Sequence, residues 1–384
     1  MQDILRRIIL ETGKRDIVPD SLKRWVQRHC DFFEIRGEKW REQDPFRFDP
    51  PEWTGSGRYP YVLGIFKEFW HMHWHYIAAC RELDVSYKVL DISGPDWLDV
   101  VEQSGCDAFL ARPSVQSSIW KQMYDERLRI LASAGGHIIF PDVESLWLWE
   151  SKRKMHYWLA SHHIPHPKTW VFYNRKSALE FADACALPIV FKSDMGSGAS
   201  GVMIFRDRSD LKRHITLCFG KGFTTYRRSP KDLEFNSILL QEYLPDVKEW
   251  RMVRIGDSYF AYEKVKQDDF HSGSHKFHYE RPPDKLLDFV KHVSEVGEFR
   301  SIDLDLFITS CGEILVNELQ ALFGQQGSRE ICRVNDVSGR MIFDETTGEW
   351  AFEPGEFCRN YMCNLRVQYV LSLLEARSII AEKA

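Results

Sequence analysis

Closely spaced carboxylates near residue 310 could hold a metal ion. Asp303 and Asp305 are two residues apart in an apolar run, so on a β-strand both would point to the same face. The turn-like segment TSCGE at 309–313 predicts a hairpin, whose returning strand places Glu318 beside Asp305 and Gln320 on the same face. Neighbouring carboxylates repel each other unless a cation lies between them, and oxygen ligands suit Mg²⁺. Because the flanking residues are apolar, the pattern favours a Mg²⁺ site over its alternative, a solvated acidic face.

A glycine-rich stretch, FKSDMGSGASGVMIF at 191–205, could bind phosphate. Lys192 closes an apolar, strand-like run, and Gly196, Gly198 and Gly201 follow it. No Lys-Ser or Lys-Thr follows the glycines, as a Walker A loop requires, and no helical pattern follows, as a dinucleotide fingerprint requires. The apolar residues after Gly201 instead predict a second strand, so the loop is the tip of an antiparallel hairpin. Its backbone N–H groups can close over phosphates, with Lys192 adding positive charge; the alternative is a flexible hairpin without a ligand.

The elements that position these residues follow from hydrophobic patterning. Residues 59–141 alternate strand-like and helix-like segments, which indicates a parallel, doubly wound α/β sheet. Within this part, residues 67–83 are predicted to form one helix, on which His71 and His75 share a face.

The rest of the chain mixes α and β patterns. Residues 1–58 indicate a helical leader that ends in a linker rich in Pro and Gly. Asn174 is a candidate N-cap for a helix that extends to 187. From Ser237 onward the chain is rich in strands and then ends in a helix.

The composition excludes several classes of protein. The 384 residues are 44% hydrophobic and carry a formal net charge of only -5, which indicates a globular chain and argues against a strongly basic nucleic-acid binder. No apolar run is long enough for a transmembrane helix, and no signal peptide is evident. The nine cysteines are scattered, as is typical of reduced thiols, so we expect a cytoplasmic protein that binds neither nucleic acid nor membrane.

Five segments follow one another in a recognisable order. They are WESKRK at 149–154, PIVFK at 188–192, GSGASG at 196–201, LLQEYLPDVKEW at 239–250 and DLFITSCGEILVNELQ at 305–320. This order resembles the ATP-grasp superfamily, in particular amide-forming ligases such as D-alanine–D-alanine ligase, glutathione synthetase and the ribosomal-protein glutamate ligases. The resemblance covers roughly residues 59–345 and implies an α/β fold that is α+β in its C-terminal part. The implied parts are a helical extension at 1–58, an N-terminal α/β domain at 59–148, a small lid subdomain at 149–240 and a catalytic subdomain with an antiparallel sheet at 241–384.

The resemblance also implies roles for individual residues. Lys152 and Lys192 would contact the phosphates of ATP, and Glu249 would accept hydrogen bonds from the ribose. The lid loop over the β- and γ-phosphates would consist of Gly196, Ser197, Gly198, Ala199, Ser200 and Gly201. The hinge whose backbone groups read adenine would consist of Gln241, Glu242, Tyr243 and Leu244. Mg²⁺, with Mn²⁺ as its substitute, would be bound by Asp305, Glu318 and Gln320.

Two positions depart from the pattern of the family. Gln320 stands where the family usually has Asn, which keeps an amide oxygen on a longer side chain. Asp303 stands where some of the ligases have an Arg that stabilises the oxyanion of the transition state. Another cation would have to replace that Arg, and the candidates are Arg251, Lys264, Lys266 and Arg329.

The resemblance implies that ATP phosphorylates a substrate carboxylate and that an amine then displaces phosphate to form an amide. The expected partners are small molecules, an amino acid, a peptide or a sugar acid, and homodimers are common in the family. Two alternatives stay open at this point. One is a phosphotransferase that makes a stable phosphorylated product, and the other is an ATP-binding regulatory or scaffold protein without catalysis.

Overall fold

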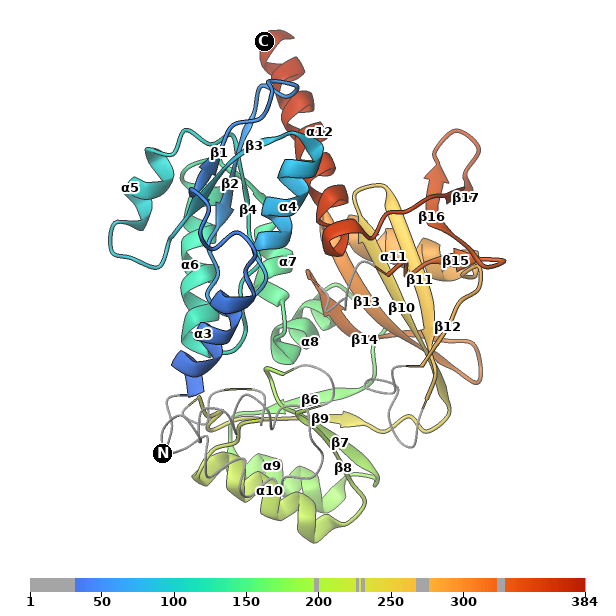
Figure 1. The fold of residues 1–384 in the computed structure, drawn as a ribbon. Helices are drawn as coiled ribbons and strands as arrows, with labels where there is room; N and C mark the ends of the chain where they lie inside the picture. The colour runs from blue at the N-terminus through green and yellow to red at the C-terminus, as the bar shows by residue number, and fades with distance from the viewer. Residues whose placement is uncertain are drawn as a thin grey trace.

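The computed structural model describes residues 32–196, 200–225, 228, 232–266, 276–322 and 329–383. Their strands form three sheets, which lie in three successive parts of the chain (Figure 1). None of the helices in these residues is long and apolar enough to cross a membrane.

The N-terminal sheet has five strands in the order β1-β3-β2-β4-β5. Its parallel strands are β2 (Val62–Phe66), β3 (Ser86–Leu90), β4 (Ala108–Leu110) and β5 (Ile138–Phe140), and β1 (Glu52–Trp53) pairs antiparallel with β3. The helices around it are α3 (Phe32–Gln43), α4 (Trp74–Leu83), α5 (Trp97–Glu102), α6 (Ser118–Ser133) and α7 (Val143–Leu148). A Cβ at Gly64 would lie 2.4 Å from the Phe109 ring, so only glycine allows β2 and β4 to pack at this point. The predicted parallel α/β sheet is confirmed.

Helix α4, which follows the first parallel strand, is shorter than predicted. It begins at Trp74, and the preceding residues form a loop in place of the helix predicted from residue 67. The Glu68 carboxylate accepts hydrogen bonds from the backbone N–H groups of Phe69, at 2.8 Å, and Trp70, at 3.1 Å. These bonds hold the backbone in a turn, because a side-chain acceptor competes with the helical ladder. His71 therefore lies in the loop, not on the face that it was predicted to share with His75.

The middle sheet is small and antiparallel, with strands in the order β6-β9-β7-β8. These strands are β6 (Thr169–Phe172), β7 (Ile189–Lys192), β8 (Val202–Phe205) and β9 (Ile238–Glu242), and helices α9 (Arg175–Ala184) and α10 (Arg208–Gly220) cover one face (Figure 1). Asn174 caps α9 as predicted, accepting a hydrogen bond from Ser177 N at 3.1 Å. Lys192 pairs with Val202, so β7 and β8 form the predicted glycine-rich hairpin.

The C-terminal sheet has eight strands and is antiparallel. They are β10 (Val247–Ile255), β11 (Ser258–Lys264), β12 (Phe277–His278), β13 (Ser301–Thr309), β14 (Ile314–Gln320), β15 (Arg333–Val334), β16 (Val337–Asp344) and β17 (Glu349–Pro354). The apolar residues of the amphipathic helix α11 (Asp284–Val296) are buried in the same hydrophobic core as the apolar residues of β10, β11 and β13.

Two further helices connect the layers. Helix α8 (Lys152–Ser161) lies between the small sheet and the C-terminal sheet (Figure 1). Helix α12 (Arg359–Lys383) follows the C-terminal sheet but lies against α4, so the end of the chain packs on the N-terminal domain (Figure 1).

Candidate nucleotide-binding site

A charged cluster lies across four strands of the C-terminal sheet. Asp305 on β13 is paired with Glu318 on β14 and with Arg251 on β10, and Glu249 on β10 is paired with Lys264 on β11. Directly paired residues of antiparallel strands point to the same face. The predicted pairing of Asp305 with Glu318 is therefore confirmed. Two cations, Arg251 and Lys264, lie on the same face in the neighbouring strands β10 and β11.

A β-bulge changes the direction of the side chains on β14. Asp305 pairs with Glu318 but Leu306 pairs with Val316, which leaves Asn317 as the extra residue. Asn317 Oδ1 accepts a hydrogen bond from Lys192 at 2.7 Å, and Glu318 lies 3.8 Å from the Lys152 amine. Two consecutive residues thus face the lysines of the lid side, which a regular strand would not allow.

Asp305 is held by two cations. Arg251 donates two hydrogen bonds to its two oxygens, both at 2.9 Å, and Lys264 bridges Asp305 and Glu249, the latter at 2.6 Å. Burial acts to raise the pKa of Asp305, but Arg251 and Lys264 outweigh it and hold that pKa well below its usual range. Asp305 is therefore a carboxylate with both oxygens occupied.

Asp303 is the less stabilised carboxylate of the cluster. Its Oδ2 lies 3.3 Å from Arg251 Nε, whereas Oδ1 has no hydrogen-bond partner within the described parts of the chain. Burial raises the pKa of Asp303 to about 7, although Arg251 counteracts it. Asp303, at the position where some of the ligases that the sequence resembles have an Arg, lies directly beside Arg251 of the neighbouring strand.

The two predicted phosphate lysines converge although they come from different elements. Lys152 opens α8 and Lys192 ends β7; both are buried. Lys152 Nζ donates to the backbone oxygen of Gly196 in the lid loop at 2.6 Å. Burial acts to lower the pKa of Lys152, but Glu318 and other nearby carboxylates outweigh it and the pKa is raised. For Lys192 burial outweighs the carboxylates and lowers the pKa to about 8. Both amines are near Glu318, so they form a positively charged end to the space between the two sheets.

A cavity lies beside these lysines, between the small sheet, α8 and β14. It is small, with a free volume of about 20 Å³. Its lining combines apolar side chains with charged and amide groups. The lining residues are Lys152, Met155, His156, Leu159, His166, Thr169, Lys192, Leu239, Gln241, Val316 and Asn317. Apolar side chains beside two lysine amines match the chemistry of a ligand with a flat ring and an anionic tail, but the free space in this arrangement holds only about one water molecule.

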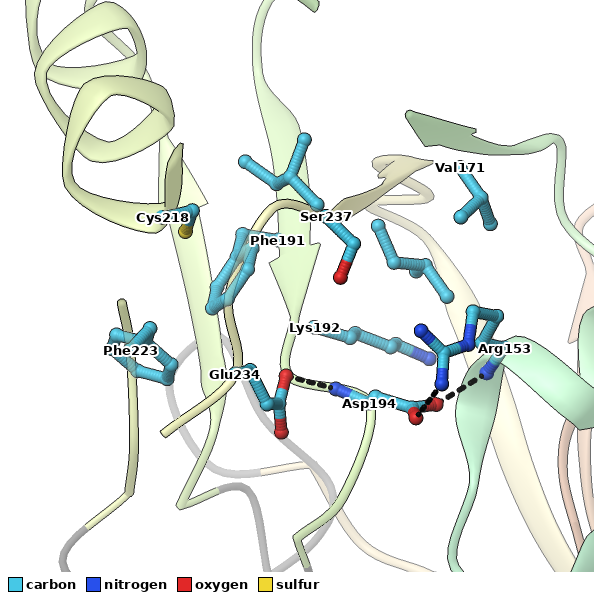
Figure 2. A pocket seen from close by; sticks show the side chains of 11 residues that line it. Arg153, Val171, Phe191, Lys192, Asp194, Cys218, Phe223, Glu234 and Ser237 are labelled. Carbon is cyan, nitrogen blue, oxygen red and sulfur yellow. Dashed lines mark hydrogen bonds and ion pairs between the residues drawn. The ribbon is translucent and has the colours of Figure 1, made fainter. Parts of the chain in front are cut away.

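The base of the lid hairpin is anchored by acidic residues that the sequence analysis did not single out. Figure 2 shows Asp194 between Arg153 and Glu234, beside Lys192. Asp194 forms an ion pair with Arg153 at 3.0 Å, and its backbone N–H donates to Glu234 at 2.8 Å. The next N–H, of Met195, donates to the same carboxylate at 3.1 Å. These bonds position the start of the glycine loop against α8; no local sequence signal pairs Asp194 with Glu234.

The structure separates the four candidate cations. Arg251 and Lys264 reach Asp305, whereas the Lys266 amine donates to the backbone oxygen of Pro245 at 2.6 Å and is exposed. Arg329 is also exposed and lies 5.7 Å from the ring centre of Tyr279. Only the first two are therefore placed to replace the missing Arg at Asp303.

The predicted nucleotide contacts are placed as follows. Gln241 and Glu242 end β9, beside the cavity, and their side chains bond to Thr169 Oγ1 at 3.0 Å and to Lys168 N at 2.7 Å. Tyr243 and Leu244 continue into the following loop, and Ser200 and Gly201 border the hairpin. Ser197, Gly198 and Ala199 lie outside the described residues. Glu249 is buried and faces Lys264, so its predicted role toward ribose stays a prediction.

The predicted Mg²⁺ ligands fit an ion only in part. Glu318 is 24% exposed and its nearest ion-pair distance is 3.8 Å, so its oxygens are accessible. The oxygens of Asp305 are occupied by Arg251 and Lys264, which would repel a divalent ion, and Gln320 Oε1 accepts a hydrogen bond from Glu150 N at 2.8 Å. Among the described residues no group of three His, Cys, Asp or Glu side chains could hold a metal. In this arrangement the predicted set does not form a Mg²⁺ site.

Comparison with known proteins identifies the fold. The sequence matches no protein-family profile and no curated protein. Its structure is similar to N5-carboxyaminoimidazole synthetase from Staphylococcus aureus in complex with ADP, with a TM-score of 0.51, 13% identity, and coverage of 73% of this chain and 74% of that one. An N5-carboxyaminoimidazole ribonucleotide synthetase, also solved with ADP, matches with a TM-score of 0.50 and 14% identity over 72% of each chain. A RimK domain ATP-grasp protein from Sphaerobacter thermophilus matches with a TM-score of 0.47 and 15% identity over 67% of this chain and 90% of that one.

The chain has the ATP-grasp fold. The resemblance seen in the five sequence segments and the three-sheet architecture therefore agree. At these identities the likeness establishes the ATP-grasp fold alone, and the chemistry has to be argued from the residues of this chain.

Proposed function

We propose that this protein is an ATP-dependent ligase that activates a substrate carboxylate and joins it to an amine. The observation that carries the proposal is the convergence of the buried Lys152 and Lys192 amines beside Asn317 and Glu318, at the base of the glycine-rich hairpin. Buried ammonium groups are costly unless anions accompany them, and phosphates would provide those anions.

The proposed reaction has two steps. A carboxylate oxygen of the substrate attacks the γ-phosphorus of ATP, and the bond to the β–γ bridging oxygen breaks to release ADP. The amine nitrogen then attacks the acyl carbon, the bond to the phosphate oxygen breaks, and inorganic phosphate and a proton leave. The product is an amide.

The residues of this chain act by positioning and by charge. Lys152 and Lys192 offset the charge that develops on the transferred phosphoryl group. Arg251, with its guanidinium beside Asp303 and Asp305, is the cation best placed to stabilise the oxyanion of the second step. Closure of the hairpin would keep water from the acyl phosphate. No step is assigned to Mg²⁺, because the oxygens of Asp305 are occupied.

One experiment tests the proposal. The protein is incubated with ATP, Mg²⁺ and pooled amino acids, short peptides, sugar acids and amines, and ADP, phosphate and new masses are measured. Formation of an amide together with equimolar ADP and phosphate is the expected result. Lys192→Ala should abolish it, whereas Lys176→Ala, in which the exposed lysine of α9 is removed, should not. A phosphorylated product without free phosphate would instead identify a phosphotransferase.

A second candidate function has one observation in its favour. The Arg251 and Lys264 bonds to Asp305 would keep a metal from that carboxylate, which favours a protein that binds ATP without catalysis. Saturable ATP binding without turnover of any substrate in the pool would favour this regulatory or scaffold role.

A further inference from the structure

The N-terminal sheet has a second group of charged residues, away from the lysines of the ATP site. In the strand order β1-β3-β2-β4-β5 the winding of the chain reverses between β2 and β4. In open α/β sheets, ligands bind outside the carboxyl ends of the strands at such a reversal. The loops that leave β2 and β4 there contain His71 and Arg112, and α12 comes close to them through its contact with α4 (Figure 1).

Arg112 is a buried cation without a carboxylate partner. It is 3% exposed, its Nε donates to His71 Nδ1 at 2.8 Å, and its Nη1 lies 3.8 Å from the Cys363 sulfur. Within the described parts of the chain it forms no ion pair, and no hydrogen bond of those residues uses its Nη2. A buried guanidinium normally has an anion beside it, because removing its charge from water costs several kcal/mol.

The neighbours of Arg112 do not supply that anion. His71 accepts the bond from Arg112, so its ring is neutral at Nδ1, and burial together with Arg112 holds the pKa of His71 well below its usual range. Burial raises the pKa of the Cys363 thiol, so this sulfur is neutral as well. Arg366, which is 2% exposed on α12, also bonds to Cys363 and brings a second positive charge.

A buried hydroxyl is part of the same group. Tyr76 on α4 is 1% exposed, and its Oη has no hydrogen-bond partner among the residues described. It interacts electrostatically with Cys363, Arg366 and Arg112, so it lies close to both guanidinium groups. A buried hydroxyl without a partner is rare in native structures and indicates that a group which would bond to it is missing.

We propose that Arg112, Arg366 and Tyr76 bind an anionic group of the substrate, a carboxylate or a phosphate, that is separate from the carboxylate activated at the ATP site. Two guanidinium groups and a hydroxyl supply the fixed donors that an oxyanion requires. The assignment to a substrate rests on the proposed ligase function, whereas the binding of an anion does not. The substrate class is then a molecule with at least two acidic groups.

The test measures the melting temperature of the full chain with saturating ADP, which occupies the ATP site, at constant ionic strength. Inorganic phosphate and acetate are titrated separately, and the one that acts at lower concentration identifies the group. We expect a saturable rise in melting temperature for the wild type. Arg112→Gln should raise the half-saturating concentration at least about tenfold, and Arg129→Gln, at an exposed arginine of α6, should not change it.

Tyr76→Phe provides a second variant in case Arg112→Gln does not fold. Its hydroxyl has no bond to lose, so the melting temperature without anion should not fall, while anion binding weakens about 3- to 10-fold. No response of the wild type to either anion, or a response in both variants equal to that of the wild type, would overturn the proposal. A separate titration with ADP keeps the two ideas distinct: failure of ADP to bind refutes the ATP site, and an anion response that depends on Arg112 would still establish this one.

Discussion

The affinity for nucleotide should depend on pH through one lysine. Burial lowers the pKa of Lys192 from 10.5 to about 8 in the free protein. A bound phosphate would favour the charged amine and raise this pKa again. Proton uptake would therefore accompany binding above pH 8, and affinity should fall as the pH rises.

The magnitude follows from the size of the shift. If the bound phosphate restores the usual pKa, the dissociation constant of ADP should rise about tenfold between pH 7 and pH 9, because each pKa unit corresponds to about 1.4 kcal/mol. The same pKa shift also makes the free energy of unfolding depend on pH. The unfolded chain binds this proton more tightly than the folded one, so Lys192 costs stability at pH 7, and the cost is relieved as the pH rises from about 8 toward 10.5.

Calorimetric titration with ADP at several pH values between 7 and 9 measures the effect. Lys192→Arg should bind ADP with little dependence on pH, because guanidinium stays protonated throughout this range. Lys176→Arg, at an exposed position of α9, should behave as the wild type does. A wild-type affinity that is constant over the range, or a pH dependence that persists in Lys192→Arg, would refute the reasoning.

Three further predictions concern the cluster on the C-terminal sheet. Glu318→Ala should abolish turnover, since its accessible carboxylate faces both lysines; an ADP-release rate within a few-fold of the wild type would contradict the site. Asn317→Ala removes the hydrogen bond to Lys192 and should weaken ADP binding about 3- to 10-fold, and an unchanged dissociation constant would show that this bond is unimportant. Lys264→Met leaves Glu249 without its lysine and should lower the free energy of unfolding by about 3–5 kcal/mol in urea titrations. The exposed Lys266→Met is the matched control and should change it by less than about 0.5 kcal/mol; similar losses in both variants would contradict the buried network.

Local sequence patterns determined much of the architecture. Alternation along a strand placed Asp303 and Asp305 on one face, and the five-residue turn placed Glu318 opposite Asp305, as the register confirms. The apolar residues after the glycine loop predicted the hairpin at Lys192. These features depend on residues that are close in the chain, so backbone geometry alone relates them.

Only the tertiary structure decided how the charges meet. The occupation of Asp305 by Arg251 and Lys264 depends on which strands are neighbours in the sheet, and the contact of Lys192 with Asn317 depends on a bulge. The order of the five segments indicated the fold, but strand pairing and burial are long-range properties that no short pattern records. The pKa values follow from burial and charged neighbours. The sequence therefore determined which groups are available to the site, and packing determined which of their charges are neutralised.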